Sequence, residues 1–258
     1  MITVTEPFSA AKHVKVDDPS KNPADTFEAL KLNLVRSFQT GIYDYHTILS
    51  LFTRSRDFST VKVAFSCTEW CGQVYEEQSF DPHEVSGFVR SYFEDESRAF
   101  RLPARGESVA EDDLFLLLRG LRGDYLPPGR TRSVWLLPSP FITRLTHRPA
   151  EWVMADIARA PEPQAVTVPA GSFRAILYIV RAGDGRVGRF WIEPSYPHRI
   201  LKWSWAGSSG KRGGFLSGDG IDEGELIRSV RLPYWRLHGQ GDERYLSGMG
   251  LDPAVPVR

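Results

Sequence analysis

The sequence predicts a mainly β protein: an antiparallel curved sheet or incomplete barrel with one or two helices. Short runs of β-branched and aromatic residues recur along the chain, separated by turns rich in glycine and proline. The longest ordered pattern spans residues 166–205, and only one segment carries a convincing helix start. No internal repeat or long linker divides the chain, so we expect a single β-rich domain over residues 1–258.

The stretch 166–205 is expected to form a three-stranded antiparallel meander. Its first turn, Ala182–Gly185, supplies glycines where a tight hairpin needs positive φ. Its second turn, Pro194–Pro197, contains two prolines that fix φ and remove backbone donors. Trp203 and Trp205 lie on one face of the last strand, and we expect that face to point toward the interior.

Gly183–Gly188 matches the G-x-G-x-x-G pattern of dinucleotide-binding loops. That pattern needs a helix N-terminus directly after it to hold the pyrophosphate. Here the strand-forming residues Phe190–Ile192 follow instead. We therefore interpret the pattern as a hairpin turn and expect no cofactor.

The other strands are predicted from alternation of apolar and polar residues. They are expected at 2–8, 28–38 (where a short helix is the alternative), 42–53, 60–67, 70–80, 87–93, 134–137, 141–145, 152–157 and 223–232. Residues 9–27 are polar and predict a loop, with room for a short strand at 13–16, and the glycine-rich 207–220 predicts a second loop. Residues 236–258 are expected to form a polar tail.

A helix is predicted over residues 108–118. Ser108 and Glu111 have the spacing of a capping box, in which each side chain satisfies a free backbone N–H at the helix start. Asp112 and Asp113 in the first turn favour the helix dipole, and a glycine at 120 or 123 ends the helix.

Composition excludes several classes of protein. The 258 residues include 32 basic and 32 acidic ones, a balance that argues against a nucleic-acid binder. The 41% hydrophobic content argues against a disordered chain. No apolar run approaches the ~18–20 residues of a membrane span. A strand pattern begins at Ile2 without a signal peptide, so we expect an upstream segment to be missing; a short edge strand is the alternative.

No metal site is predicted. The six histidines are scattered without the spacing of paired ligands. An acidic group formed by Asp219, Asp222, Glu223 and Glu225 fits no EF-hand pattern, and we interpret it as a solvated turn.

The best candidate site is Ser66–Gly72, which follows a strongly predicted strand. It combines Glu69, Trp70 and two thiols, and we interpret it as the floor of a ligand pocket, with Trp70 as a wall and Glu69 as the polar anchor. The alternative is a strand bend with a buried tryptophan and a core cysteine. A bend would also allow a Cys67–Cys71 disulfide in an oxidising compartment.

Aromatic residues are the second candidate feature. Tyr43 and Tyr45 share one strand face, as do Trp203 and Trp205, and Trp235 lies near the C-terminus. Such residues fill a core or line an apolar pocket. With Glu69 and Trp70 they form the predicted ligand-binding set.

Six runs of the chain resemble, in the same order, a family of uncharacterised bacterial proteins often labelled septum-formation inhibitors by transferred annotation. These runs are Lys31–Asn33, Phe38–Tyr45, Ser66–Gly72, Tyr92–Glu94, Glu111–Leu114 and Arg231–Trp235. The resemblance implies a secreted or lipid-anchored envelope protein with a longer N-terminus and no activity that can be named. The meander is also loosely similar to β-rich lipoprotein-carrier folds.

These observations leave three functions open, in this order of preference. The first is a non-enzymatic envelope protein that binds an apolar, amphipathic or lipid-like small molecule in the concave face of the sheet. The second is a structural or interaction protein without a pocket. The third is an enzyme with an acid/base centre at Glu69. A location on the periplasmic side of the envelope is expected if an upstream segment exists, and a cytoplasmic one if Met1 is the true start.

Overall fold

The computed structural model describes residues 1–207 and 221–251. Among these residues the chain builds two sheets. The first sheet is an antiparallel meander of β1 (Ile2–Ser9), β2 (Thr26–Thr40), β3 (Tyr43–Arg54), β4 (Thr60–Glu69), β5 (Gly72–Phe80), β6 (Glu84–Ser91) and β7 (Arg98–Pro103). The second has the order β15 (Ile221–Glu225), β14 (Ile200–Ala206), β13 (Val187–Ile192), β12 (Gly171–Ala182), β10 (Val153–Arg159), β9 (Thr131–Leu137) and β8 (Ser108–Ala110). β11 (Gln164–Val168) pairs with β12 outside this order, and β8 runs parallel to β9.

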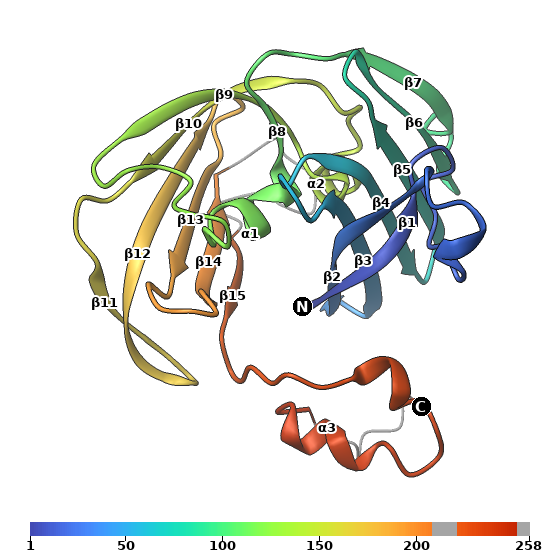
Figure 1. Cartoon of the computed structure of the whole chain (residues 1–258). Helices are drawn as coiled ribbons and strands as arrows, with labels where there is room; N and C mark the ends of the chain where they lie inside the picture. Colours follow the sequence, from blue (N-terminus) through green and yellow to red (C-terminus); the bar gives the residue numbers. More distant parts are fainter. Residues whose placement is uncertain (208–220, 252–258) are drawn as a thin grey trace.

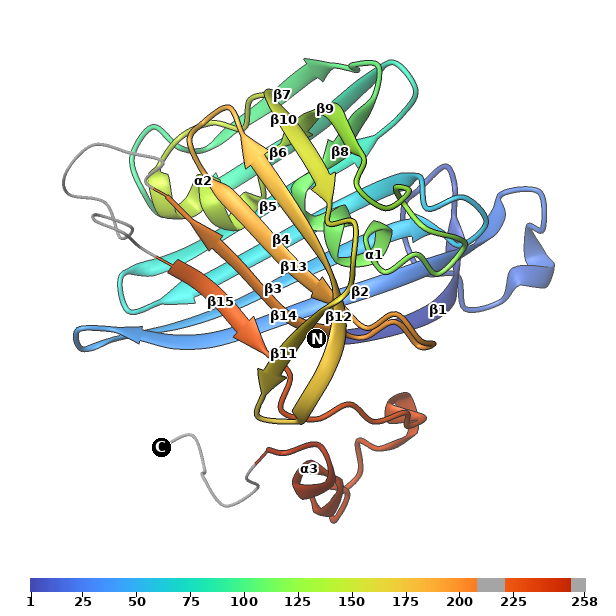
Figure 2. The same ribbon diagram turned by 90° about the vertical axis from the view of Figure 1, so that its left-hand side faces the viewer.

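The two sheets lie on either side of two short helices, α1 (Leu114–Leu117) and α2 (Pro140–Thr146) (Figure 1). The view in Figure 2 shows the strands of the second sheet crossing in front of the longer strands of the first. One apolar core joins both sheets and both helices, including Leu49 and Phe65 from the first sheet and Phe190 from the second. Strands make up 51% of the chain and the sheets do not close, so the predicted mainly β class is confirmed.

Alternation correctly predicted most strands. β2, β3, β4, β5, β6, β9 and β10 lie within a few residues of their predicted bounds. The meander is confirmed as β12, β13 and β14, and Gly185 adopts φ 90 in the predicted hairpin turn. Gly188 has a structural role there, because a Cβ at this position would lie 2.9 Å from the ring of Trp205. The G-x-G-x-x-G pattern is thus part of a hairpin and of its packing.

The predicted helix over 108–118 is wrong in its first half. Ser108–Ala110 form β8 and pair with β9, so Ser108 cannot cap a helix. A 3-10 turn, Glu111–Asp113, follows, and α1 has only four residues. The tertiary structure overrides the local capping pattern, because the three acidic side chains of this turn bind partners far away in the sequence.

Two further predictions are corrected. Residues 141–145 form α2 and not a strand: Ser139 caps the helix by accepting from the Phe141 N–H, and Pro140 occupies its first turn. The last strand ends at Glu225 and does not continue to residue 232. The Leu226 N–H still donates to the Leu201 C=O, but the Leu226 C=O accepts from the Ala170 N–H in the β11–β12 turn. The tail contains a 3-10 turn, Tyr234–Arg236, and α3 (Arg244–Gly248). The predicted loop at 207–220 lies, after Gly207, outside the described residues.

Candidate functional site

A hollow of about 350 Å³ is open between the two sheets, at the end of the first sheet where β3 turns into β4 and β5 into β6. Both sheets contribute to its walls, and so does α1. Its larger apolar lining residues are Phe58, Phe80, Val85, Val109, Leu117, Val134 and Trp152. The lining is of mixed character, because serine, threonine, tyrosine and charged side chains stand beside the apolar ones. The volume of the hollow lies in the range of small-molecule sites.

Asp113 is the buried polar residue of this hollow. Its side chain is only 2% exposed, and Oδ2 accepts from the Thr60 hydroxyl and from the Ala110 N–H. Oδ1 has no hydrogen-bond partner among the described residues. Burial raises the pKa of Asp113 to about 7, although the bonds from Thr60 and Ala110 act in the opposite direction. A carboxyl with an unused oxygen and a pKa near neutrality is a candidate binding group.

The other charged groups of the hollow already have partners. Glu107 pairs with Arg132 at 3.0 Å, and Asp81 accepts from the backbone N–H groups of His83 and Glu84. Burial raises the pKa of Tyr125, with smaller contributions from Glu107 and Asp113 and an opposing one from Arg132. The lining contains four acidic residues, Asp57, Asp81, Glu107 and Asp113, and one basic residue, Arg132. The hollow therefore favours a cation or a hydrogen-bond donor.

Two residues of the lining have strained backbones. Phe58 has φ 58 and Glu107 has φ 51, both in the left-handed region that bulky side chains rarely adopt. Such strain costs on the order of 1–2 kcal/mol per residue and often marks functional sites.

The turn that holds Asp113 is fixed by a buried ion pair. Glu111 receives two hydrogen bonds from Arg186, at 2.9 Å to Oε1 and 2.7 Å to Oε2. Arg186 is 2% exposed, lies over the Trp205 ring and also donates to Asp184. Burial opposes its charge, but Glu111 and Asp184 outweigh burial and raise the Arg186 pKa. This bidentate pair connects the acidic turn to the β12–β13 hairpin.

Asp112, the middle residue of the acidic turn, interacts with Ser139 and with the charge of Arg36. Burial and the neighbouring Glu111 raise its pKa to about 8, against hydrogen bonding from Ser139 and the charge of Arg36. Arg36, from β2, donates to Asp222 of β15 at 3.2 Å and lies 4.1 Å over the Phe141 ring. Asp222 was expected in a solvated turn, but burial raises its pKa. The Arg36–Asp222 pair thus spans the two sheets.

Glu69 lies elsewhere, at the opposite end of the first sheet. Its side chain is buried, accepts from the Cys71 N–H at 2.6 Å and lies 3.6 Å from Arg144 of α2. It does not line the hollow at Asp113. A carboxylate held in this way by a backbone N–H and an arginine fixes a turn, and that geometry gives no support to an acid/base role.

The structure brings together only part of the predicted ligand-binding set. Tyr43 and Trp70 lie at one end of the first sheet with ring centroids 5.8 Å apart, and Tyr45 stacks on Phe38. Trp203 and Trp205 face the core as expected, but they pack on Phe115 and Phe190 respectively. Trp235 lies in the tail and is exposed. None of these residues lines the hollow at Asp113.

The disulfide that a bend would allow between Cys67 and Cys71 is not present. Cys67 faces the core on β4, whereas Cys71 is exposed in the β4–β5 turn, and both thiols are free. Burial raises the pKa of Cys67, against an opposing effect of Arg144, so its thiol is not activated.

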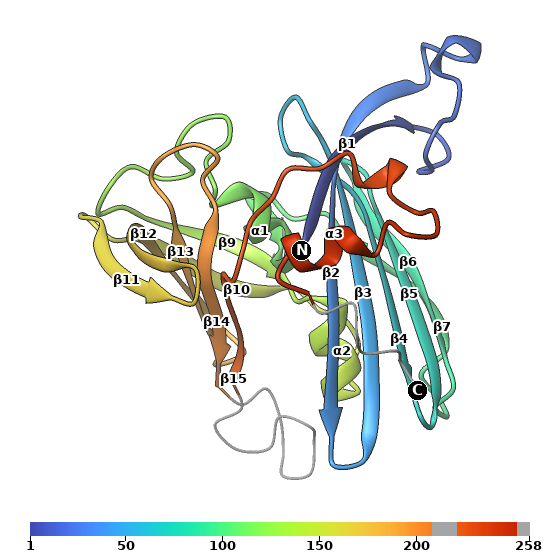
Figure 3. The ribbon, with the colours of Figure 1, turned by 90° about the horizontal axis from the view of Figure 1, so that it is seen from below.

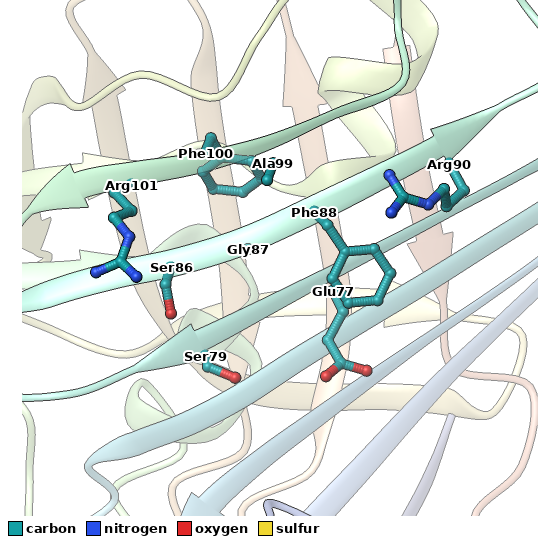
Figure 4. A pocket seen from close by; sticks show the side chains of 9 residues that line it. All are labelled: Glu77, Ser79, Ser86, Gly87, Phe88, Arg90, Ala99, Phe100 and Arg101. Atoms are coloured by element: carbon teal, nitrogen blue, oxygen red, sulfur yellow. The ribbon is translucent and has the colours of Figure 1, made fainter.

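A second hollow, of about 720 Å³, lies on the outer face of the first sheet over β5, β6 and β7 (Figure 4). It is shallow, and two of its charged groups are paired: Glu77 binds Lys62 and Tyr75, and Arg101 binds Glu84. Its third charged group, Arg90, lies 5.5 Å over the Phe88 ring. Gly87 at its centre leaves space for the Phe100 ring. Packing therefore accounts for this glycine.

The sequence did not single out Asp113 or Arg186 as site residues. The sequence placed Asp113 in the first turn of a predicted helix, where acidic residues are common. It placed Arg186 directly after a predicted hairpin turn. Three consecutive acidic residues directly before the apolar run Leu114–Leu118 were the one available signal, because such a cluster next to core residues needs buried partners. No family model, curated protein or solved structure matches the chain. The described part of the chain contains no helix with the length and hydropathy of a membrane span.

Proposed function

We propose that the protein is a non-enzymatic binding protein that takes a small amphipathic amine into the hollow at Asp113. One observation carries the proposal: Asp113 lines a hollow between the sheets, and its buried Oδ1 has no partner among the described residues. The apolar walls would hold the ligand body. Asp113 would accept hydrogen bonds from its ammonium group.

The charge of the hollow supports an amine over a carboxylate. An anionic head would meet Asp113, and the one arginine of the lining is already paired with Glu107. Like charges in a site of low dielectric are costly. A neutral alcohol could donate to Asp113 but would gain no ion pair, so it should bind more weakly than the amine.

Calorimetric titration with three eight-carbon probes tests the proposal. At pH 8, octylamine is expected to bind at least about tenfold more tightly than octanol, and octanoate is expected not to bind. Octylamine affinity should also rise between pH 6 and pH 8, because Asp113, with a pKa of about 7, becomes ionised over this range while the amine stays charged.

Asp113→Asn is the matched variant, since it keeps an acceptor for Thr60 and Ala110 and removes only the charge. It should abolish the preference for octylamine over octanol. Asp57→Asn, which changes another acidic residue of the same lining, is the control and should keep that preference. Equal binding of octylamine and octanoate, or unchanged selectivity in Asp113→Asn, would contradict the proposal.

An envelope location, expected from the resemblance, is part of this proposal. Fractionation of the host cell tests it separately: the protein should be found with the envelope fraction. Recovery with the cytoplasmic proteins would refute the location and leave the ligand proposal intact.

A further inference from the structure

Three hairpin tips lie side by side at one end of the first sheet. Since β1 to β7 form an antiparallel meander, the β2–β3, β4–β5 and β6–β7 turns share the same end, seen at the bottom of Figure 3. This is the end opposite the mouth of the Asp113 hollow, which is lined by the β3–β4 and β5–β6 turns.

Each tip presents large apolar or aromatic side chains to solvent. Ile42 is 70% exposed, Trp70 63% and Tyr92 66%, and Tyr43 is partly exposed beside Trp70. We call these four residues the hairpin rim. Isolated exposed apolar residues are ordinary, but four that gather on three neighbouring tips at one end of a sheet indicate an interaction surface.

The rim is held rigidly. A Cβ on Gly72 would lie 2.5 Å from the Tyr92 ring, so this glycine provides the space against which Tyr92 packs. The Tyr43 side chain hydrogen-bonds that of Cys71. Tyr92 N–H donates to the Gln73 C=O, which ties the third tip to the second. Preordered side chains lose little entropy when they bind.

Several backbone donors of the second and third tips bind acceptors within the protein. Cys71 N–H donates to Glu69, Phe93 N–H to the Ser91 hydroxyl, and Ser91 N–H to the Ser97 hydroxyl. This matters because an N–H that leaves water without a partner costs several kcal/mol in lipid, on the order given for unsatisfied groups. The buried Glu69, which lies 3.6 Å from Arg144, removes this cost for the Cys71 N–H of the second tip.

The charged residues of the three tips limit the kinds of partner that the hairpin rim can bind. The tips 39–44, 69–73 and 92–97 contain no lysine or arginine, and their exposed charges, Glu94 and Asp95, are acidic. Anionic lipids and acidic proteins are thus disfavoured. Tryptophan and tyrosine are enriched at the boundary between lipid headgroups and acyl chains. A fluid lipid surface can also meet three separate tips at once.

We propose that the hairpin rim docks the protein onto a zwitterionic lipid surface, with Ile42, Trp70 and Tyr92 entering the headgroup boundary. The interaction is apolar, so it is insensitive to salt. The hollow at Asp113 then opens away from the lipid.

Flotation with phosphatidylcholine vesicles tests the proposal on the full chain. The wild type is expected to float with the vesicles equally at low and high salt. The triple variant Ile42→Ser, Trp70→Ser, Tyr92→Ser should lose at least about tenfold in partitioning. Because these side chains are exposed, its melting temperature should match that of the wild type.

A double variant, Tyr196→Ser with Trp235→Ser, is the matched control. It removes a tyrosine and a tryptophan that are 75% and 56% exposed but lie away from the rim, and it should float like the wild type. The proposal is overturned if the wild type does not float, if high salt releases it, or if the triple and control variants lose binding equally.

Discussion

Arg186→Met is expected to destabilise the protein by about 3–5 kcal/mol, the cost of removing one partner from a buried ion pair. Arg186 makes two hydrogen bonds to Glu111 and a third to Asp184, and it is 2% exposed. The methionine would fill most of the volume over Trp205, but it would leave the Glu111 carboxylate buried without its cation. Urea unfolding followed by circular dichroism measures the effect.

Arg181→Met, on the neighbouring strand and exposed, is the control and should stay within about 0.5 kcal/mol of the wild type. The double variant Glu111→Gln, Arg186→Met should recover part of the loss, because it leaves no unpaired charge. A cost below about 1 kcal/mol for Arg186→Met would show that Glu111 does not depend on this pair.

Stability is expected to fall by about 2 kcal/mol as the pH rises from 6.5 to 8. Burial raises the pKa of Asp112 to about 8, with a further increase from Glu111, and burial raises that of Asp113 to about 7. In the unfolded chain both carboxyls are already ionised above pH 6. The folded state therefore binds protons that the unfolded state does not, and its advantage is lost as the pH rises through these two pKa values.

Urea unfolding midpoints measured at several pH values test this dependence of stability on pH. The double variant Asp112→Asn, Asp113→Asn should give a clearly shallower profile over the same range and should be more stable than the wild type at pH 8. Carboxyls whose pKa is lowered, such as that of Glu193 beside Arg199, lose their contribution only in acid, so they do not affect this window. A wild-type profile that is flat between pH 6.5 and 8 would contradict the buried state of the two acids.

Much of the first sheet could be predicted from sequence, because each of its strands alternates between a core face and an outer face. Val61, Val63, Phe65 and Cys67 of β4 all face the core, as their spacing predicts. The hairpin at Gly185 followed from glycine chemistry in the same way. Local patterns thus sufficed where strands pair with their neighbours in sequence.

The candidate site could not be predicted in this way, since it depends on contacts between distant segments. Ser108 and Glu111 have capping-box spacing, but Glu111 binds Arg186 and Ser108 lies in a strand. Asp113 meets Thr60 across 53 positions of the chain. Glu69 was chosen for its sequence neighbours and serves to fix a turn. No local pattern specifies which acidic residue a second sheet will bury.

The carboxyl titration of Asp113, followed by NMR with carbon-13 labelled aspartate, tests the central claim most directly. The free protein should show this carboxyl titrating at a pKa of about 7, and excess octylamine should lower that value because the ammonium group stabilises the ionised form. Titration near the ordinary value of about 4 in the free protein, or a pKa that octylamine leaves unchanged, would contradict the assignment of Asp113 as the binding group.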